Sequence, residues 1–338
     1  MLFSPKSCTF AAKLELVYMS RRFNILTALL CVVLCAHAME YEERIPYGDF
    51  EQWAVRYITE SKILGGKTKE LYAIAPTDTI YTNSAFTYGL HGNPWTVSNA
   101  YAKVAGVEKG SNSVYAERRG NGWCARLDCK LDSVVAMRII DLKVLVAGSI
   151  FTGKTHEPVS RKGANDPYSV IELGVPFTRH PSALRLDYKA VIEPSDSIIF
   201  AKATSYPRVR RGTDCAEIYV YLQRRWEDTN GRLHASRVGT AYMRVEHSVP
   251  QWHNDCTIPI RYGDITIQPG YHDYEGLNEH HFRAMNSRGQ MVLIEEDNYS
   301  EDAPTHMIIM MTSSRYEAFV GHAGNTLWVD NIRLVYDH

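Results

Sequence analysis

The chain has 338 residues, 45% of them hydrophobic, and its formal net charge at pH 7 is −1. This balance gives no reason to expect nucleic acid as a partner, and the apolar content is enough for one large or two modest cores. No segment repeats with a period of about 20–50 residues, which excludes solenoids and propellers.

Residues 1–38 are predicted to be a secretory signal peptide. The basic pair Arg21-Arg22 precedes an apolar run at 25–35, and Ala36-His37-Ala38 supplies a cleavage site of the small-x-small kind. The run is too short for a membrane-spanning helix, and no other segment is long and apolar enough to be one. We therefore expect a secreted, periplasmic or cell-surface protein without a transmembrane span.

Two details of this leader bear on its processing. Met19 stands directly before the basic pair and is a better start for a signal peptide than Met1. Cys35 suggests a lipid anchor, but Leu34 precedes it where lipoprotein signals need a small residue. A lipid anchor at Cys35 is therefore the less favoured alternative.

Strands are predicted along nearly the whole mature chain. From Ala216, apolar residues at 216, 218, 220 and 222 alternate with Glu217, Tyr219 and Tyr221, which is the period of a half-buried strand. The same alternation runs from Trp123 to Leu131. Further strands are expected at 139–146, 183–192, 233–245, 291–294 and 306–312.

The turns between these strands predict an all-β fold. Asn230-Gly231, between Trp226 and Leu233, is the strongest short signal for a tight hairpin. Antiparallel strands separated by Gly, Pro and Asn turns, with little helical periodicity, indicate an antiparallel β-sandwich or jelly roll. Long loops are expected at about 152–167 and 268–290, the second with room for one helical turn.

One domain at 39–338 is the favoured organisation. The alternative is a small β unit at 39–113 followed by a jelly roll at 114–338, because Gly110-Ser111-Asn112-Ser113 has the composition of a linker.

Four cysteines remain after removal of the leader: Cys124, Cys129, Cys215 and Cys256. If Cys124 and Cys129 share one strand, they lie about 16 Å apart on opposite faces, too far to bond to each other. A disulfide would have to join one of them to Cys215 or Cys256; buried free thiols are the alternative. The absence of a C-x-x-C pair argues against structural zinc.

Six stretches together resemble a known family. The mature part opens with Ile45-Pro46-Tyr47-Gly48-Asp49-Phe50-Glu51-Gln52-Trp53 and closes with Leu327-Trp328-Val329-Asp330-Asn331-Ile332-Arg333-Leu334-Val335-Tyr336. The other four begin at Gly66, Arg119, Pro167 and Gln223. The chain resembles the putative carbohydrate metabolism domain family of secreted bacterial proteins over nearly all of the mature part. The resemblance implies a β-jelly-roll similar to galactose-binding and carbohydrate-binding modules, and an oligo- or polysaccharide as partner.

The resemblance also implies a structural calcium ion near the meeting of the first and last strands. By that resemblance Glu51 and Asp330 would hold the ion, with Asp49 as a weaker third ligand. Carboxylates are what calcium prefers, since it takes six to eight oxygen ligands. The alternative is that Glu51 and Asp330 are ordinary surface acids or form hydrogen bonds with nearby backbone.

Sugar binding needs flat apolar rings for the pyranose face and polar groups for its hydroxyls. The aromatic residues placed by strand parity, loop position or polar neighbours become candidate ligand-binding residues, with the His272 and Tyr274 loop as the densest cluster. They are Trp95, Tyr219, Tyr221, Trp226, Trp252, His272 and Tyr274. For each ring the alternative is packing, and for the two strand tyrosines packing on a second buried face is about as expected as ligand contact.

No catalytic residue is assigned. Nucleophile elbows, phosphate loops and dinucleotide fingerprints are missing. Glycosidases need a pair of carboxyls, and chance alone supplies such pairs among the candidates Glu172, Glu217, Glu227, Glu275, Glu295 and Glu296.

Three functions stay open: a non-catalytic glycan-binding protein for polysaccharide capture or metabolism, a glycoside hydrolase or lyase on the same scaffold, and a structural or adhesive surface protein. The first is favoured, with outer-membrane proteins of polysaccharide utilisation as expected partners.

Overall fold

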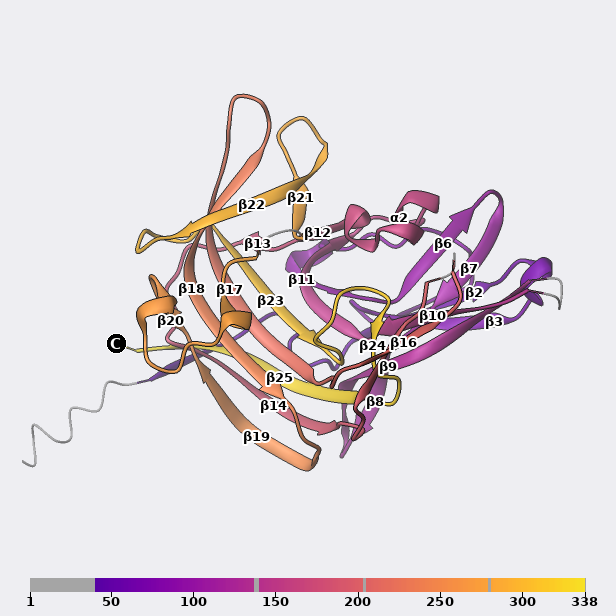
Figure 1. Ribbon diagram of the computed structural model, residues 1–338, viewed down its shortest axis with the longest axis horizontal. Helices are drawn as coiled ribbons and strands as arrows, with labels where there is room; N and C mark the ends of the chain where they lie inside the picture. Colours follow the sequence, from indigo (N-terminus) through magenta and orange to yellow (C-terminus); the bar gives the residue numbers. More distant parts are fainter. Residues whose placement is uncertain (1–39, 137–139, 203–204, 279–280, 338) are drawn as a thin grey trace, which may run out of the picture. The chain divides into compact units, whose positions relative to one another are not determined.

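The structure is a computed structural model that describes residues 40–136, 140–202, 205–278 and 281–337 (Figure 1). The predicted signal peptide and Cys35 lie outside the described residues. Residues Glu42–Tyr336 form one compact unit. No described helix is long and apolar enough to cross a membrane.

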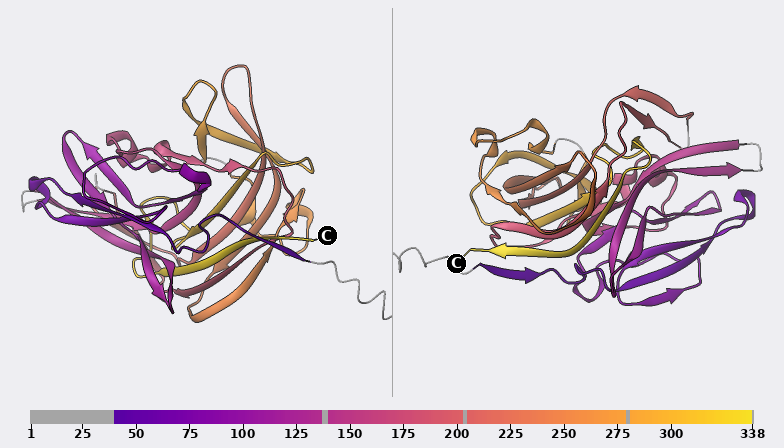
Figure 2. Two further views of the ribbon diagram at one scale, coloured as in Figure 1. Left: turned by 180° about the vertical axis from the view of Figure 1, so that it is seen from behind. Right: turned by 90° about the horizontal axis from the view of Figure 1, so that it is seen from below.

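The all-β prediction is confirmed, and Figure 2 shows from two further sides that most of the chain is strand. Only α2 (Arg161–Asn165) is an α-helix among the described residues. Single 3-10 turns complete the helical part: η1 (Lys62–Leu64), η2 (Leu90–Gly92), η3 (Pro167–Val170), η4 (Ile265–Ile267) and η5 (Asp273–Glu275). The last lies in the loop expected at 268–290.

One sheet runs in the order β10-β9-β25-β14-β19, with β8 paired to β9. All its pairs given by register are antiparallel, as a sandwich sheet requires. Its strands are β8 (Val114–Arg119), β9 (Gly122–Ala136), β10 (Ile140–Ala147), β14 (Ala183–Val191), β19 (Val249–Pro259) and β25 (Thr326–Tyr336). Strand β1 (Tyr41–Arg44) precedes them in the chain.

The second sheet has ten strands, ordered β12-β11-β23-β17-β18-β22-β21, with β13 on β23, β20 on β18 and β5 on β11. Its pairs are antiparallel except for β18 and β22, which are parallel. The strands are β5 (Trp95–Val97), β11 (Ser149–Thr155), β12 (Ile171–Leu173), β13 (Val175–Pro176), β17 (Ala216–Glu227), β18 (Leu233–Val245), β20 (Arg261–Tyr262), β21 (Arg283–Met285), β22 (Met291–Tyr299) and β23 (His306–Thr312).

Three small sheets complete the fold. One contains β15 (Ser197–Phe200), β16 (Arg208–Arg211) and β24 (Val320–Gly321), and another β2 (Trp53–Thr59), β3 (Thr68–Ile74) and β4 (Asp78–Ile80). The third is the hairpin of β6 (Ala100–Val104) and β7 (Val107–Ser111). Gly110–Ser113, the stretch considered as a linker, lies at the end of β7 and leads into β8.

The main core lies between the two large sheets. Ile218 and Val220 of β17 and Ile309 of β23 contact a cluster that also contains Leu127, Leu186 and Val329 of the other sheet. Burial of aliphatic side chains from both inner faces is what holds a sandwich together. The predicted alternation of β17 is therefore confirmed on its apolar face.

The hairpin predicted at Asn230-Gly231 joins β17 to β18. Gly231 has φ +85°, the left-handed conformation that such turns need and that glycine adopts without strain. The register slips by one between Leu222 and Gln223, because Val238 on the partner strand forms a bulge.

The four cysteines among the described residues are free thiols in the structure: Cys124, Cys129 and Cys215 are buried and Cys256 is partly buried. Burial raises the pKa of Cys124 and of Cys215 to about 12. Such thiols are inert at neutral pH, in line with the free-thiol alternative.

Candidate functional site

An aromatic row lies on the face of the ten-stranded sheet that points away from the main core. It consists of Tyr221, Tyr219, Tyr242, Tyr274 and His272. Ring centroids of successive members are 4.6, 5.2, 5.3 and 5.0 Å apart. Tyr219 and Tyr221 are buried, whereas the side chain of Tyr274 is 37% exposed. The row thus leads from the interior to the surface, and four of its five members are predicted ligand-binding residues.

Strand register places the first three rings. Tyr219 of β17 is the cross-strand partner of Tyr242 of β18, and Tyr221 follows on the same face two residues later. Tyr274 and His272 come from the η5 loop. The loop is held by Glu275, whose carboxylate accepts from the backbone N–H of His272 at 2.9 Å and pairs with Arg261 at 2.7 Å.

Glu217 and Arg244 add opposite charges beside the row. They are cross-strand partners, and Arg244 Nε donates to Glu217 Oε1 at 2.8 Å. The guanidinium of Arg244 lies 3.5 Å from the centroid of the Tyr274 ring, a cation–π contact. Burial raises the pKa of Glu217, although hydrogen bonds from Tyr242 and Arg244 favour its charged form.

A cavity of about 770 Å³ adjoins the row, and Glu217 and Tyr219 are part of its wall. Other aromatic residues of the wall are Phe151, Tyr168 and Phe282. Burial raises the pKa of Tyr168 to about 12, so its hydroxyl stays a hydrogen-bond donor at neutral pH. A volume of this size and a mainly apolar lining with a few polar groups are typical of small-molecule sites.

The remaining ring predictions fall elsewhere. Trp226 is 45% exposed and stacks on His234 at the far end of β17, with centroids 5.5 Å apart. Trp252 lies on the other large sheet, with the guanidinium of Arg119 3.9 Å above its ring. The sequence named these two among the candidate ligand-binding residues, and the structure does not place them in the aromatic row.

Trp95 requires a correction, because it was expected in an exposed loop. It begins β5 and is fully buried in the main core, where its indole N–H donates to the carbonyl of Pro46 at 2.9 Å. The Gly-Asn-Pro sequence before Trp95 forms the end of the loop, and Trp95 itself is the first residue of the strand that follows. A ring so enclosed offers no face to a ligand in this structure.

Arg119 connects two carboxylates on the neighbouring strands β14 and β25. Its Nη1 lies 2.7 Å from Asp187 Oδ2 and 2.6 Å from Asp330 Oδ2, so these oxygens are at most 5.3 Å apart. Burial raises the pKa of Asp330 to about 6. Burial also opposes ionisation of Asp187, but hydrogen bonds from Asn331, the Asp255 backbone and Arg119 lower its pKa. Sequence analysis singled out Asp330 and missed Asp187.

The three residues expected to hold calcium have different surroundings. Asp330 is buried against Arg119, whereas the exposed Glu51 accepts from the backbone N–H of Trp123 at 3.1 Å. Asp49 is half-buried. Among the residues that the structure describes, the one group of three close metal-ligating side chains is His234, Glu295 and Asp297. Calcium at the chain ends stays a prediction.

The carboxylates considered for hydrolysis do not form one cluster. Of the buried ones, Glu217 pairs with Arg244, Glu275 with Arg261 and Glu296 with Arg237. Outside the interior, Glu172 is paired with His156, Glu227 accepts from Ser287, and Glu295 lies beside His234. Each buried candidate therefore has an arginine as its immediate partner.

The sequence matches the family described as Putative carbohydrate metabolism domain over residues 50–335. The match covers almost all of the compact unit. This chain belongs to that family. A search of curated proteins gave no match. The family name implies a role connected with carbohydrate.

Sequence reasoning missed Tyr242, the middle ring of the row, and Arg244, which lies over the Tyr274 ring. Counting back from the Asn230-Gly231 hairpin without a bulge would pair Tyr219 with Ala241 and Glu217 with Met243. The slip at Val238 shifts the partners by one residue, to Tyr242 and Arg244. The spacing of Tyr242 and Arg244, two residues apart, shows in the sequence that they share a face of β18. Only the bulge at Val238 puts that face on the same side of the sheet as Tyr219 and Glu217.

Proposed function

We propose that this chain binds oligo- or polysaccharides at the outer end of the aromatic row, without cleaving them. The observation that carries the proposal is the exposed end of the row, where Tyr274 and His272 stack 5.0 Å apart with ring planes only 6° from parallel. Exposed, pre-stacked rings suit the CH-rich face of a pyranose, and Arg244 stands beside them as a donor for hydroxyls.

The surroundings of the row favour binding over chemistry. Arg244 neutralises Glu217, a carboxylate beside the row, at 2.8 Å. The rings are also positioned before any ligand arrives, which lowers the entropic cost of binding. We further propose that the protein works in polysaccharide capture outside the cytoplasm, as a secreted, periplasmic or surface protein with outer-membrane partners.

The test is a glycan-array screen of the purified chain, followed by affinity measurements on each hit. Tyr274→Ala should weaken binding about 3- to 10-fold, the effect of losing one aromatic contact. Tyr206→Ala is the matched control, because this tyrosine is 83% exposed and lies outside the row. Unchanged affinity in both Tyr274→Ala and His272→Ala would overturn the proposed site.

Hydrolysis is the second candidate, and Asp187 and Asp330 favour it. Two carboxyls within about 5.5 Å, one with a raised pKa, are typical of retaining glycosidases. Product analysis on every array hit decides between the candidates. Recovery of intact glycan supports binding alone. Release of shorter sugars that is abolished by Asp330→Asn would establish hydrolysis and overturn a purely binding function.

A further inference from the structure

Three neighbouring strands place a tryptophan, a histidine and a glutamate in one row across the ten-stranded sheet. Trp226 of β17 is the cross-strand partner of His234 of β18, and His234 is the partner of Glu295 of β22. The Trp226 ring stacks on the imidazole with ring planes 20° from parallel. Neighbouring strands thus fix both the position and the tilt of the His234 ring.

Asp297 joins this row through the alternation of β22. Glu295 and Asp297 are two residues apart and share one face, while Glu296 between them is buried on the other face against Arg237. The parallel register slips here, since Ala235 pairs with Glu296 but Ser236 pairs with Asn298, which leaves Asp297 unpaired. A β-bulge of this kind can turn a side chain, here that of Asp297, in a direction that regular strand pairing would not give it.

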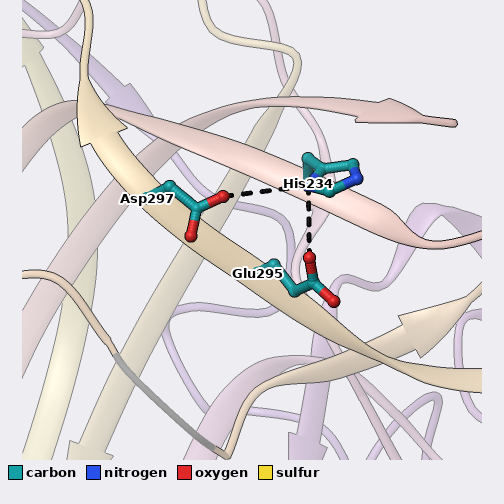
Figure 3. A group of neighbouring side chains, drawn as sticks. All are labelled: His234, Glu295 and Asp297. Atoms are coloured by element: carbon teal, nitrogen blue, oxygen red, sulfur yellow. Dashed lines mark ion pairs between the residues drawn. The ribbon is translucent and has the colours of Figure 1, made fainter.

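The three side chains converge on one point (Figure 3). His234 Nδ1 lies 3.4 Å from Glu295 Oε2 and 3.8 Å from Asp297 Oδ2. The three ligand atoms are all within 4.8 Å of one another. Ligands bound to one ion at about 2.1 Å are at most about 4.2 Å apart, so small side-chain rotations bring all three to bonding distance.

Asp228 approaches the opposite nitrogen of the ring. Its Oδ2 is 3.6 Å from His234 Nε2, and the carboxylate is held by the backbone N–H groups of Asn230 and Arg232 at 2.9 Å each. A carboxylate on one ring nitrogen keeps the proton there and turns the lone pair of the other nitrogen toward a metal. In this arrangement Asp228 is a positioning residue for Nδ1.

The local charge favours a divalent cation. With a neutral imidazole, the three carboxylates carry three negative charges and the nearby Arg232, 2.9 Å from Asp228, supplies one positive charge. One nitrogen with two carboxylate oxygens is a ligand set suited to zinc or manganese, whereas calcium takes oxygen ligands. The set leaves coordination positions open for water or for ligand hydroxyls.

We propose that His234 Nδ1, Glu295 and Asp297 bind one divalent transition-metal ion, and that Asp228 orients the imidazole for it. The site lies beside the exposed ring of Trp226, on the opposite face of β17 from Tyr219 and Tyr221. It does not depend on saccharide binding by the aromatic row, so either can fail without the other.

The experiment uses the purified chain, stripped with chelator and titrated with Mn²⁺ while free ion is followed by electron paramagnetic resonance. We expect one Mn²⁺ per chain, displaced by equimolar Zn²⁺ but not by equimolar Mg²⁺. Asp297→Asn and His234→Gln should each weaken binding at least 10-fold, and Asp228→Asn about 10-fold. Asp302→Asn, an exposed aspartate paired with Arg224, should bind as the unchanged protein does.

Three results would overturn the site. They are Mn²⁺ affinity in His234→Gln equal to that of the unchanged protein, displacement by Mg²⁺ as easily as by Zn²⁺, and no bound ion at all. The first two would mean loose attraction to surface acids, and the third an ion-pair cluster around a protonated His234. Asp297 is largely exposed, so its substitution leaves folding intact and keeps the test valid if His234→Gln is unstable.

Discussion

The two faces of the ten-stranded sheet differ in what they bury. The face toward the other large sheet contains Ile218, Val220 and Ile309 in an aliphatic core. The opposite face buries Tyr219, Tyr221 and Phe282, together with ion pairs. Both faces exclude water, but only the second does so with groups that need specific partners.

This difference indicates which face specifies the fold and which prepares a site. Aliphatic side chains pack in many arrangements of similar energy. A buried Arg237 with Glu296, or Glu217 with Arg244, requires one arrangement, because an unpaired charge there is costly. The second face therefore holds its rings in a fixed order up to Tyr274, where they become accessible.

Among the substitutions that test the difference between the two faces, the largest effect on stability is expected at Glu296. Its side chain and that of Arg237 are almost completely buried, and Arg237 Nε donates to Glu296 Oε1 at 2.7 Å. Glu296→Gln should lower the free energy of unfolding by about 3–5 kcal/mol, because it leaves a buried guanidinium unpaired. Urea unfolding measures the loss. Glu295→Gln, next to it but on the opposite face of β22 and partly exposed, should cost less than about 0.5 kcal/mol.

A substitution on the aliphatic face should separate stability from binding. Ile218→Ala removes a fully buried side chain from the main core and should cost about 2–5 kcal/mol. Glycan affinity of the folded fraction should stay unchanged, since Ile218 points away from the row. An affinity loss as large as that of Tyr274→Ala would show that the two faces are not independent.

A smaller effect is expected from pH at the chain ends. Burial raises the pKa of Asp330 from 3.8 to about 6. The folded form therefore holds this proton more tightly than the unfolded one, and its stabilising contribution is present below about pH 4 and lost as pH rises through 6. Asp330→Asn should flatten the fall in unfolding free energy over this range. Glu246→Gln, an exposed control, should leave the fall as it is.

The smallest expected effect concerns calcium. If Glu51 and Asp330 hold an ion in addition to the contact with Arg119, excess chelator should lower the melting temperature, and added CaCl₂ should restore it by mass action. Glu51→Gln should then remove the response. A melting temperature that chelator leaves unchanged would eliminate the predicted ion.

Much of the fold was predictable because the alternation of apolar and polar residues indicates a half-buried β-strand. The expected bounds 233–245 and 306–312 agree with β18 and β23, and the hairpin turn lies at Asn230-Gly231. Strand β22 was predicted only to residue 294 because its second half, Glu295-Glu296-Asp297-Asn298, is polar. In this half the pairing with β18 and the ion pair between Glu296 and Arg237 stabilise a strand, although these residues have a weak intrinsic preference for β structure.

The candidate site was predictable only in its local parts. Tyr219 and Tyr221 followed from strand parity, and His272 and Tyr274 from the density of polar and aromatic residues in one loop. Their stacking depends on the bulge at Val238 and on Arg261 holding Glu275, neither of which a local pattern reveals. Trp95 is a case in which the local pattern misled. The Gly-Asn-Pro sequence before it predicted a loop, but the ring packs in the main core.

The parallel pairing of β18 with β22 has a consequence for the order of folding. The hairpin of β17 and β18 needs only a local turn, but β22 can join β18 only after the chain has passed through β19 in the other large sheet and returned. Closing so long a connection is slow and comes after local contacts form. Glu295, Glu296 and Asp297 are therefore expected to reach their partners on β18, His234 and Arg237, only after the hairpin of β17 and β18 has formed.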